Sequence, residues 1–276
     1  MNALHSFHRG AGLAATLLFA IVTASAWAAA PTAPPGVRSE LAPTAQLRVG
    51  LLTQNPSFVT KDGAPAEMQG VAVELGRELA KQLGVPFAPV RYASVAKLID
   101  GGKAGEWDVA FLGFEQERTA YMDFTAPYLE VGNTYLVPAG SKIRNLADVD
   151  KPGQRIAVTQ RSVQDRYLSK NIKHAELIRV GSGSDAAQLL SAGKVHVITS
   201  NRIVLLKFAK EIPGSRLLDE NYMTARHVLA VAKNRPAGTA YAKKFIEHAK
   251  ASGSVQQAIA RAQLHGAKVA ALEPGM

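Results

Sequence analysis

The chain has 276 residues, of which 47% are hydrophobic and 20% charged, and its mean hydropathy is close to zero. These values exclude a disordered or collagen-like chain and predict a globular protein with one or two cores. The sequence contains no cysteine, which excludes disulfides, thiolate metal ligands, cysteine nucleophiles and thiol-linked lipid anchors. The formal net charge of +10 indicates nucleic acid, an anionic membrane or an acidic ligand as partner.

Residues 1–28 have the order of a secretory signal peptide: a basic start, an apolar run, and a small-x-small cleavage site at Ala26–Ala28. The apolar run is shorter than the roughly 20 residues of a membrane-spanning helix, and no twin arginine precedes it. We therefore expect a signal for the general secretory route rather than an anchor. A protein exported without a lipid needs an outer barrier to be retained, so we expect a soluble periplasmic protein that is not lipid-anchored. In that compartment nucleic acid is not an expected partner.

The segment that follows the signal, residues 29–45, is rich in proline and alanine and shows no apolar period. We interpret it as a flexible leader.

The first half of the remaining chain alternates predicted strands and helices. Strands are predicted over 47–52, 86–92 and 107–112, and a helix over 70–84 places Leu75, Leu79 and Leu83 on one face. Gly84 is a stop signal for this helix, and Ser94 is a plausible N-cap for the next one. The order β-α-β-α-β is typical of a parallel sheet covered by helices.

The second half repeats this pattern. Strands are predicted over 155–160, 175–181, 195–199 and 227–233, helices start at Ser162 and Ser184, and two helices close the chain over 238–250 and 254–264. Two α/β units predict two lobes, with connecting strands around 133–140 and 227–233. Ligand sites of such proteins lie between lobes, beyond the C-terminal ends of strands.

The first two of these strand ends carry an aromatic and a group of charged residues. Phe58 either forms an apolar wall over a ligand or packs into its lobe. Arg118 follows Gly113 and Glu115, and could hold a carboxylate by two parallel charged hydrogen bonds. The alternative is a solvated Arg118 paired with a neighbouring glutamate.

The other two strand ends belong to the second unit. Ser162 stands at a predicted helix N-terminus, which attracts anions, and Arg161 would add to this attraction if its side chain pointed inward. An ordinary capped helix with an exposed Arg161 is the alternative. Asn201 can donate and accept hydrogen bonds but carries no charge, and a simple turn would use the same residue.

The sequence resembles the family 3 extracellular solute-binding proteins of ABC transporters, of the polar amino-acid type, from about residue 47 to 262. The resemblance rests on four blocks in the family's order, of which Asp-Phe-Thr-Ala-Pro-Tyr at 123–128 with Arg118 upstream is the most specific. The blocks are EMQGVAVELGRELAKQLG, GEWDVAFLGFEQERTAYMDFTAPYLEVG, LADVDKPGQRIAVTQRS and LLSAGKVHVITSN.

The resemblance implies a type II periplasmic-binding-protein fold, α/β with two lobes and two linking strands. Lobe 1 would comprise 46–134 plus 230–270, and lobe 2 would comprise 135–229. A hinge would close the lobes on the ligand, and an ABC permease in the inner membrane would read the closed form. We also expect a monomer without metal or cofactor. Arg118, helped by Ser162, would grip the ligand's α-carboxylate, and the residue at 201, usually Asp, would take the α-ammonium.

The sequence departs from the family at this site. Asn201 replaces the acid, Arg161 stands where a glycine is usual, and the loop from Gly113 to Arg118 is short. These departures favour either a more anionic ligand or an amino acid whose ammonium meets Glu115, because an unpaired buried charge is costly.

Two other functions stay open. The fold also resembles cyclohexadienyl dehydratase, a periplasmic enzyme whose chemistry needs a general acid, and Glu115 is the candidate. A receptor that presents its ligand to a sensor is the second. A metal site is not expected, because the histidines beyond the signal show no metal-ligand spacing.

Overall fold

The computed structural model describes Met1 and residues 33–274. The predicted signal peptide, apart from Met1, lies outside the described residues, and so does the start of the predicted leader. Among the described residues, no helix is long and apolar enough to cross a membrane.

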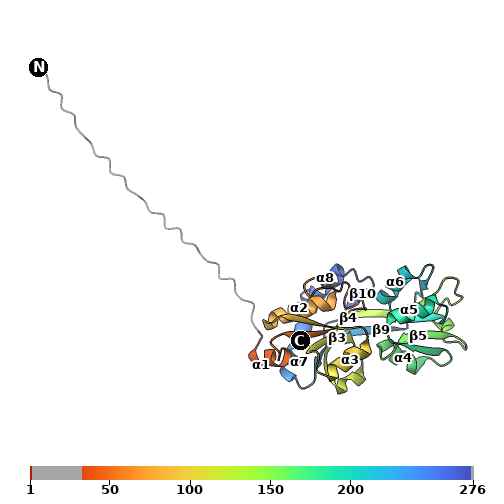
Figure 1. Cartoon of the computed structure of the whole chain (residues 1–276), viewed down its shortest axis with the longest axis horizontal. Helices are drawn as coiled ribbons and strands as arrows, with labels where there is room; N and C mark the ends of the chain where they lie inside the picture. Colours follow the sequence, from red (N-terminus) through yellow and green to blue (C-terminus); the bar gives the residue numbers. More distant parts are fainter. Residues whose placement is uncertain (2–32, 275–276) are drawn as a thin grey trace. The chain divides into compact units, whose positions relative to one another are not determined.

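The described chain alternates strands and helices, as predicted (Figure 1). The strands are β1 Leu47–Leu52, β2 Phe87–Tyr92, β3 Val109–Gly113, β4 Met122–Val137, β5 Arg155–Thr159, β6 Glu176–Val180, β7 Val197–Asn201, β8 Arg216–Leu217, β9 Met223–Ala232 and β10 Ala267–Val269. The helices are α1 Pro35–Leu41, α2 Val71–Leu83, α3 Val95–Lys103, α4 Val163–Asn171, α5 Gly183–Ser191, α6 Arg202–Glu211, α7 Pro236–Ala251 and α8 Ser254–Arg261, with 3-10 turns η1 Gln116–Ala120 and η2 Leu146–Asp148.

Local sequence signals explain where these helices begin and end. In α2, Leu75, Leu79 and Leu83 are buried on one face. Gly84 ends this helix in the left-handed conformation, with φ 64°, which glycine adopts without strain. The Ser94 side chain accepts a hydrogen bond from the backbone N–H of Lys97 and caps α3. These predicted boundaries are confirmed to within a few residues.

One continuous sheet has the order β2-β1-β3-β9-β4-β7-β5-β6, with β8 and β10 paired to β4. β1 is parallel to β2 and β3 at one end, and β5 is parallel to β6 and β7 at the other. The long strands β4 and β9 are antiparallel to each other and stand between the two parallel groups. Figure 1 shows β4 and β9 running from the group around α2, α3 and α7 to the group around α4, α5 and α6. The predicted fold class, two α/β lobes linked by two strands, is confirmed.

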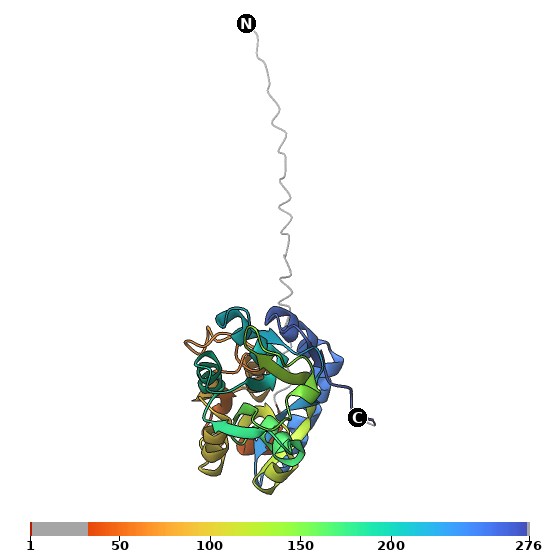
Figure 2. The same ribbon diagram turned by 90° about the vertical axis from the view of Figure 1, so that its right-hand side faces the viewer.

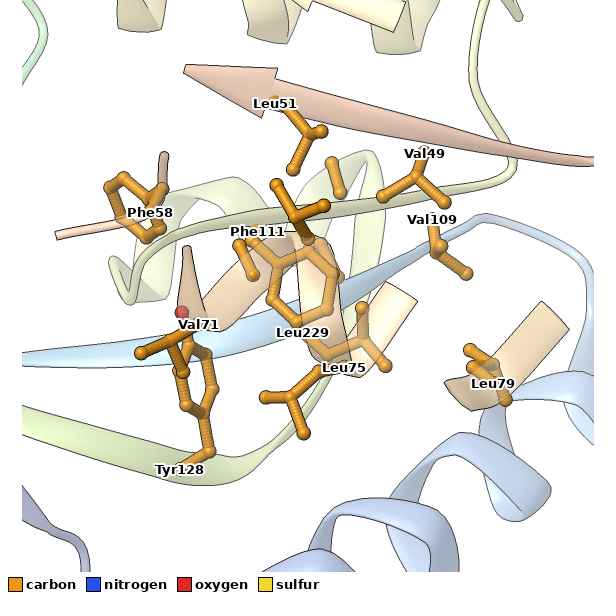
Figure 3. Close-up of a cluster of buried hydrophobic side chains, with 14 of the residues drawn as sticks. Val49, Leu51, Phe58, Val71, Leu75, Leu79, Val109, Phe111, Tyr128 and Leu229 are labelled. Atoms are coloured by element: carbon orange, nitrogen blue, oxygen red, sulfur yellow. The ribbon is translucent and has the colours of Figure 1, made fainter. Parts of the chain in front are cut away.

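Buried side chains form separate cores on either side of the linking strands. The largest core packs β1, β3, α2 and parts of β4 and β9 together, as Figure 3 shows. The rings of Phe111 and Tyr128 within it lie edge to face. Two smaller cores cover the faces of the sheet formed by β5 and β7, one of them under α5 and α6. Figure 2 views the molecule from the end that carries these helices. We call the part around the largest core the first lobe and the part around the smaller cores the second lobe.

We propose that the lobes divide at the predicted position within β4, but before residue 229 within β9, a residue that the prediction assigned to lobe 2. In β4, Val131 belongs to the core of the first lobe, whereas Tyr135 and Leu136 belong to the two cores of the second. In β9, Leu229 belongs to the core of the first lobe. The change of core along β4 supports a boundary near residues 134 and 135.

The predicted flexible leader is wrong for residues 35–41, which form helix α1. Val37 and Leu41 are buried, and α1 packs against α7. The backbone N–H of Gly238, in the first turn of α7, donates to the Glu40 carboxylate at 2.7 Å. Pro35 at the first helical position suits a helix start, and these tertiary contacts stabilise a helix that is too short to show an apolar period.

A second difference concerns the start of α5, which Ser182 caps instead of Ser184. The Ser182 hydroxyl accepts from the backbone N–H of Asp185, and the Asp185 carboxylate accepts from the backbone N–H of Ser182. This reciprocal capping box needs an acid three residues after the cap, a condition that Ser182 meets and Ser184 does not.

Candidate functional site

The candidate site is a pair of cavities between the two lobes, at the C-terminal ends of β1, β3, β5 and β7. The larger has a volume of about 90 Å³ and the smaller about 40 Å³, and they share five lining residues. The smaller cavity is lined by Leu52, Asn55, Phe58, Val95, Gly113, Arg118, Ser162, Val163, Gln164, Asn201 and His227. The strand ends predicted to carry the site therefore meet here.

Arg118 is the charged group of this site. It lies in η1 and is 1% exposed, and its guanidinium donates to the carbonyl oxygens of Gly113 at 2.5 Å and Arg161 at 2.7 Å. Burial lowers the pKa of Arg118 to about 10, so it stays protonated at neutral pH. Among the described residues no carboxylate forms an ion pair with it. The nearby Glu115 carboxylate partly offsets the cost of burying this charge, but it forms neither a hydrogen bond nor an ion pair with Arg118. An anion bound directly beside the guanidinium would therefore be stabilised.

Gly113 positions Arg118 and lets the lobes approach each other. It is the last residue of β3, and its carbonyl accepts one of the two hydrogen bonds that hold the guanidinium. A Cβ atom at Gly113 would lie 2.7 Å from Cγ1 of Val163, a residue of the second lobe. Gly113 therefore contributes to the site through its carbonyl oxygen and through the absence of a side chain.

Ser162 lines both cavities at the N-terminus of α4. Its hydroxyl oxygen accepts from the backbone N–H of Asp165 at 3.1 Å, as the predicted N-cap requires. The free N–H groups and the helix dipole at this end favour an anion in the cleft, close to Arg118.

Arg161 does not line either cavity with its side chain. The guanidinium forms an ion pair with Asp100 of α3 at 3.1 Å, across the two lobes. The backbone of Arg161 has φ 60°, and its carbonyl accepts from Arg118. Arg161 thus contributes its backbone to the site, while its side chain pairs with Asp100, as in the alternative of a capped helix with an outward-pointing Arg161.

Asn201 lies at the end of β7 and caps α6. Its Oδ1 accepts from the backbone N–H of Val204 at 3.1 Å and from the Ser57 hydroxyl of the first lobe at 3.2 Å. The side chain is 2% exposed and lines the smaller cavity. Asn201 therefore lies at the smaller cavity, and its amide oxygen already accepts two hydrogen bonds within the protein.

Phe58 combines both roles considered for it. It is buried among the side chains of the first lobe, as Figure 3 shows, and it also lines the smaller cavity. Its ring stacks on the imidazole of His227 with centroids 4.6 Å apart.

Glu115 is partly buried but is not among the residues that line either cavity. Burial raises the pKa of its carboxyl group, and the charge of Arg118 opposes this rise. The structure therefore does not place Glu115 where an ammonium or a leaving group in these cavities would meet it.

His227 is a site residue that sequence reasoning missed. It stands in β9, is 3% exposed, and its Nδ1 has no hydrogen-bond partner among the described residues. Burial lowers its pKa to about 3, so the imidazole is neutral at physiological pH. The sequence signal for His227 is a polar residue at the start of the apolar run 227–233. The run itself predicts a linking strand and does not indicate a cavity.

Gln164 is a second missed residue of the wall. Its amide nitrogen donates to the Asn133 side-chain oxygen on β4 at 2.5 Å, and its side chain lines both cavities. Gln164 lies two residues after the Ser162 N-cap, so the helix start that brings Ser162 to the cleft also brings Gln164 there.

Charged pairs surround the cleft and join the lobes. Besides Arg161 and Asp100, Glu117 of η1 pairs with Arg166 and Lys170 of α4, the latter at 3.7 Å. These pairs are largely exposed, so each contributes little on its own. Within residues 33–274, no three His, Cys, Asp or Glu side chains gather as a metal site would require.

Two α/β lobes on two linking strands, with a buried arginine between them that has no ion-pair partner among residues 33–274, are typical of two-lobed solute-binding proteins. The chain belongs to the bacterial extracellular solute-binding proteins, family 3, which match residues 47–262. The predicted family is thus confirmed.

Among curated relatives, the chain is 22% identical over 193 residues to the ABC transporter glutamine-binding protein GlnH of Bacillus subtilis (strain 168), which covers 68% of this chain and 70% of that protein. It is 26% identical over 153 residues to cyclohexadienyl dehydratase of Pseudomonas aeruginosa, which covers 53% of this chain and 55% of that enzyme. A crystal structure of the solute receptors for L-cysteine of Neisseria gonorrhoeae aligns with a TM-score of 0.72 and 20% identity, over 83% of this chain and 94% of that one. This last likeness shows the fold.

Proposed function

We propose that the protein is an extracytoplasmic receptor that binds a small carboxylate-bearing solute between its lobes and delivers it to an ABC permease. The observation that carries this proposal is Arg118, a buried cation held by two backbone carbonyls with no described carboxylate partner. A ligand carboxylate beside the Ser162 helix N-terminus would supply the missing negative charge.

Ligand binding is tested by isothermal titration calorimetry of the purified protein against amino acids and small organic acids. We expect at least one carboxylate to bind, and Arg118→Ala to weaken it by about 100-fold or more, since a buried charge pair loses one partner. Arg144→Ala, an exposed arginine of the second lobe, is the matched control and should bind as the wild type does. Binding that survives Arg118→Ala unchanged would contradict the site assignment.

The delivery step concerns the partner rather than the ligand. Family membership and the two linking strands support hinge closure and recognition by a permease. Deletion of the protein should abolish uptake of the identified ligand by cells. Loss of a ligand response with unchanged uptake would instead identify a receptor for a sensor.

A dehydratase is the second candidate, favoured by the similarity to cyclohexadienyl dehydratase. That chemistry needs a general acid beside the leaving hydroxyl. Glu115, the acid considered for this role, lies outside the described cavity walls, and the curated relatives include binding proteins. We therefore propose binding without catalysis, and turnover of prephenate or arogenate by the purified protein would reverse this choice.

A further inference from the structure

The charged side chains on the cavity walls indicate which charge a bound ligand must carry. Among the described residues that line the two cavities, Arg118 and His227 are the ionisable ones. The walls otherwise consist of apolar side chains, hydroxyls and amides. A carboxylate finds its counter-charge in Arg118, but an ammonium buried in the same space would face only neutral groups and a nearby cation.

The orientation of Asn201 adds a second constraint. A backbone N–H can only donate, so the bond from Val204 fixes which amide atom is the oxygen. That oxygen also accepts from Ser57, so its acceptor capacity is used within the protein. What Asn201 can still offer a ligand is its amide N–H₂, a donor. A donor suits a carbonyl or hydroxyl oxygen and opposes an ammonium, which is itself a donor.

His227 lines the smaller cavity together with Asn201 and Arg118. Its ring is fixed by stacking on Phe58, and its Nδ1 is buried without a partner among the described residues. A buried polar atom without a partner costs free energy that a ligand hydrogen bond would recover. A neutral imidazole carries one donor and one acceptor, so it can pair with a hydroxyl or carbonyl oxygen.

We infer that the cleft selects a small monoanionic 2-hydroxy or 2-oxo carboxylic acid over the amino acid of the same side chain, with Asn201 and His227 bonding the α-oxygen. This inference rests on the proposed function and narrows its ligand class. The carboxylate lies at Arg118 in the smaller cavity, and the rest of the ligand extends toward the larger one, where Val204 and Phe208 contribute apolar surface.

The test compares acids that differ only at the α-carbon. Matched sets run from lactate, pyruvate and alanine to the corresponding C4 and aromatic monocarboxylic acids, and each is titrated into the purified protein by calorimetry. We expect the tightest ligand to be a hydroxy or oxo acid that binds about tenfold or more tighter than its amino acid, the scale set by an unpaired buried polar group. An amino acid as the tightest member of its set overturns this inference and leaves the proposed function intact. Failure of every carboxylate to bind overturns both.

The variant Asn201→Asp reports on the α-substituent directly. Aspartate is as good an N-cap as asparagine, so α6 keeps its cap while the cavity gains a carboxylate. We expect the preference to shift by about tenfold or more toward the amino acid of the set. An unchanged preference, in a variant whose melting temperature shows it is folded, overturns the assignment of Asn201.

The variant His227→Phe keeps an aromatic ring against Phe58 and removes the nitrogens. It should weaken the hydroxy or oxo acid by about tenfold, while the exposed His174→Ala binds as the wild type does. Equal affinity of His227→Phe and wild type for the tightest acid overturns the role of the imidazole.

Discussion

The buried His227 makes folding stability depend on pH. Its pKa of about 3 lies below the ordinary value of 6.5 because burial disfavours the charged imidazolium. Below pH 6.5 the unfolded chain binds a proton at this residue that the folded chain does not. His227 therefore does not reduce the free energy of unfolding above pH 6.5. As the pH falls from 6.5 toward 3, the unfolded chain takes up this proton and the free energy of unfolding decreases.

We expect the free energy of unfolding to fall by up to about 1.4 kcal/mol per pH unit below pH 6.5 on account of His227. The measurement is urea denaturation of wild type and His227→Gln at pH 7 and pH 5. The glutamine variant lacks this titration and should show the smaller loss between the two pH values. His174→Ala removes an exposed histidine and should follow the wild type; equal losses in all three proteins would contradict the prediction.

At the scale of elements, β3 and α4 approach each other closely where Gly113 faces Val163, and under the proposed hinge closure this approach should affect ligand binding. Gly113→Ala would bring a Cβ atom to 2.7 Å from Cγ1 of Val163, closer than such atoms can lie. We expect ligand affinity to fall by about tenfold or more, since overpacking costs 1–3 kcal/mol. Calorimetry measures the loss.

The double variant Gly113→Ala with Val163→Ala serves as the control for this steric argument. Removal of the two methyl groups of Val163 makes room for the new Cβ atom, so most of the affinity should return. If the double variant binds as weakly as Gly113→Ala alone, the contact across the cleft is not the cause.

The ion pairs between α3, η1 and α4 should favour the closed arrangement in a salt-dependent way. We expect Asp100→Asn combined with Glu117→Gln to weaken ligand binding a few-fold at low ionic strength, and the difference to shrink at high salt. Asp62→Asn breaks a pair of similar exposure within the first lobe and serves as the control. An equal effect of the control would show that general charge, not closure, is responsible.

At the scale of the whole molecule, periodicity predicted the alternation of strands and helices and the two linking strands. Buried strands such as β3 and amphipathic helices such as α2 carry strong local signals, and strand ends of an α/β sheet converge by topology. Helix α1 was missed because contact with α7, far away in sequence, stabilises it.

The site was predicted less completely, because side-chain direction depends on tertiary partners. Arg118, Ser162 and Asn201 follow strand ends and were found there. Arg161 follows a strand end as well, but its side chain forms an ion pair with Asp100 of the other lobe. His227 stands within β9 rather than at a strand end, and a polar residue at the start of the apolar run 227–233 does not by itself indicate a cavity residue.

Helix α1 has a practical consequence for any shortened form of the protein. The family match begins at Leu47, which would suggest that residue as the first of a minimal domain. A chain cut there would lose helix α1, whose buried Leu41 packs where α1 meets α7, and the Glu40 carboxylate that holds the first turn of α7. Expression and tagging should therefore keep the chain from Ala33 onward, since a fusion joined directly to β1 would leave an apolar side of α7 bare and prone to aggregation.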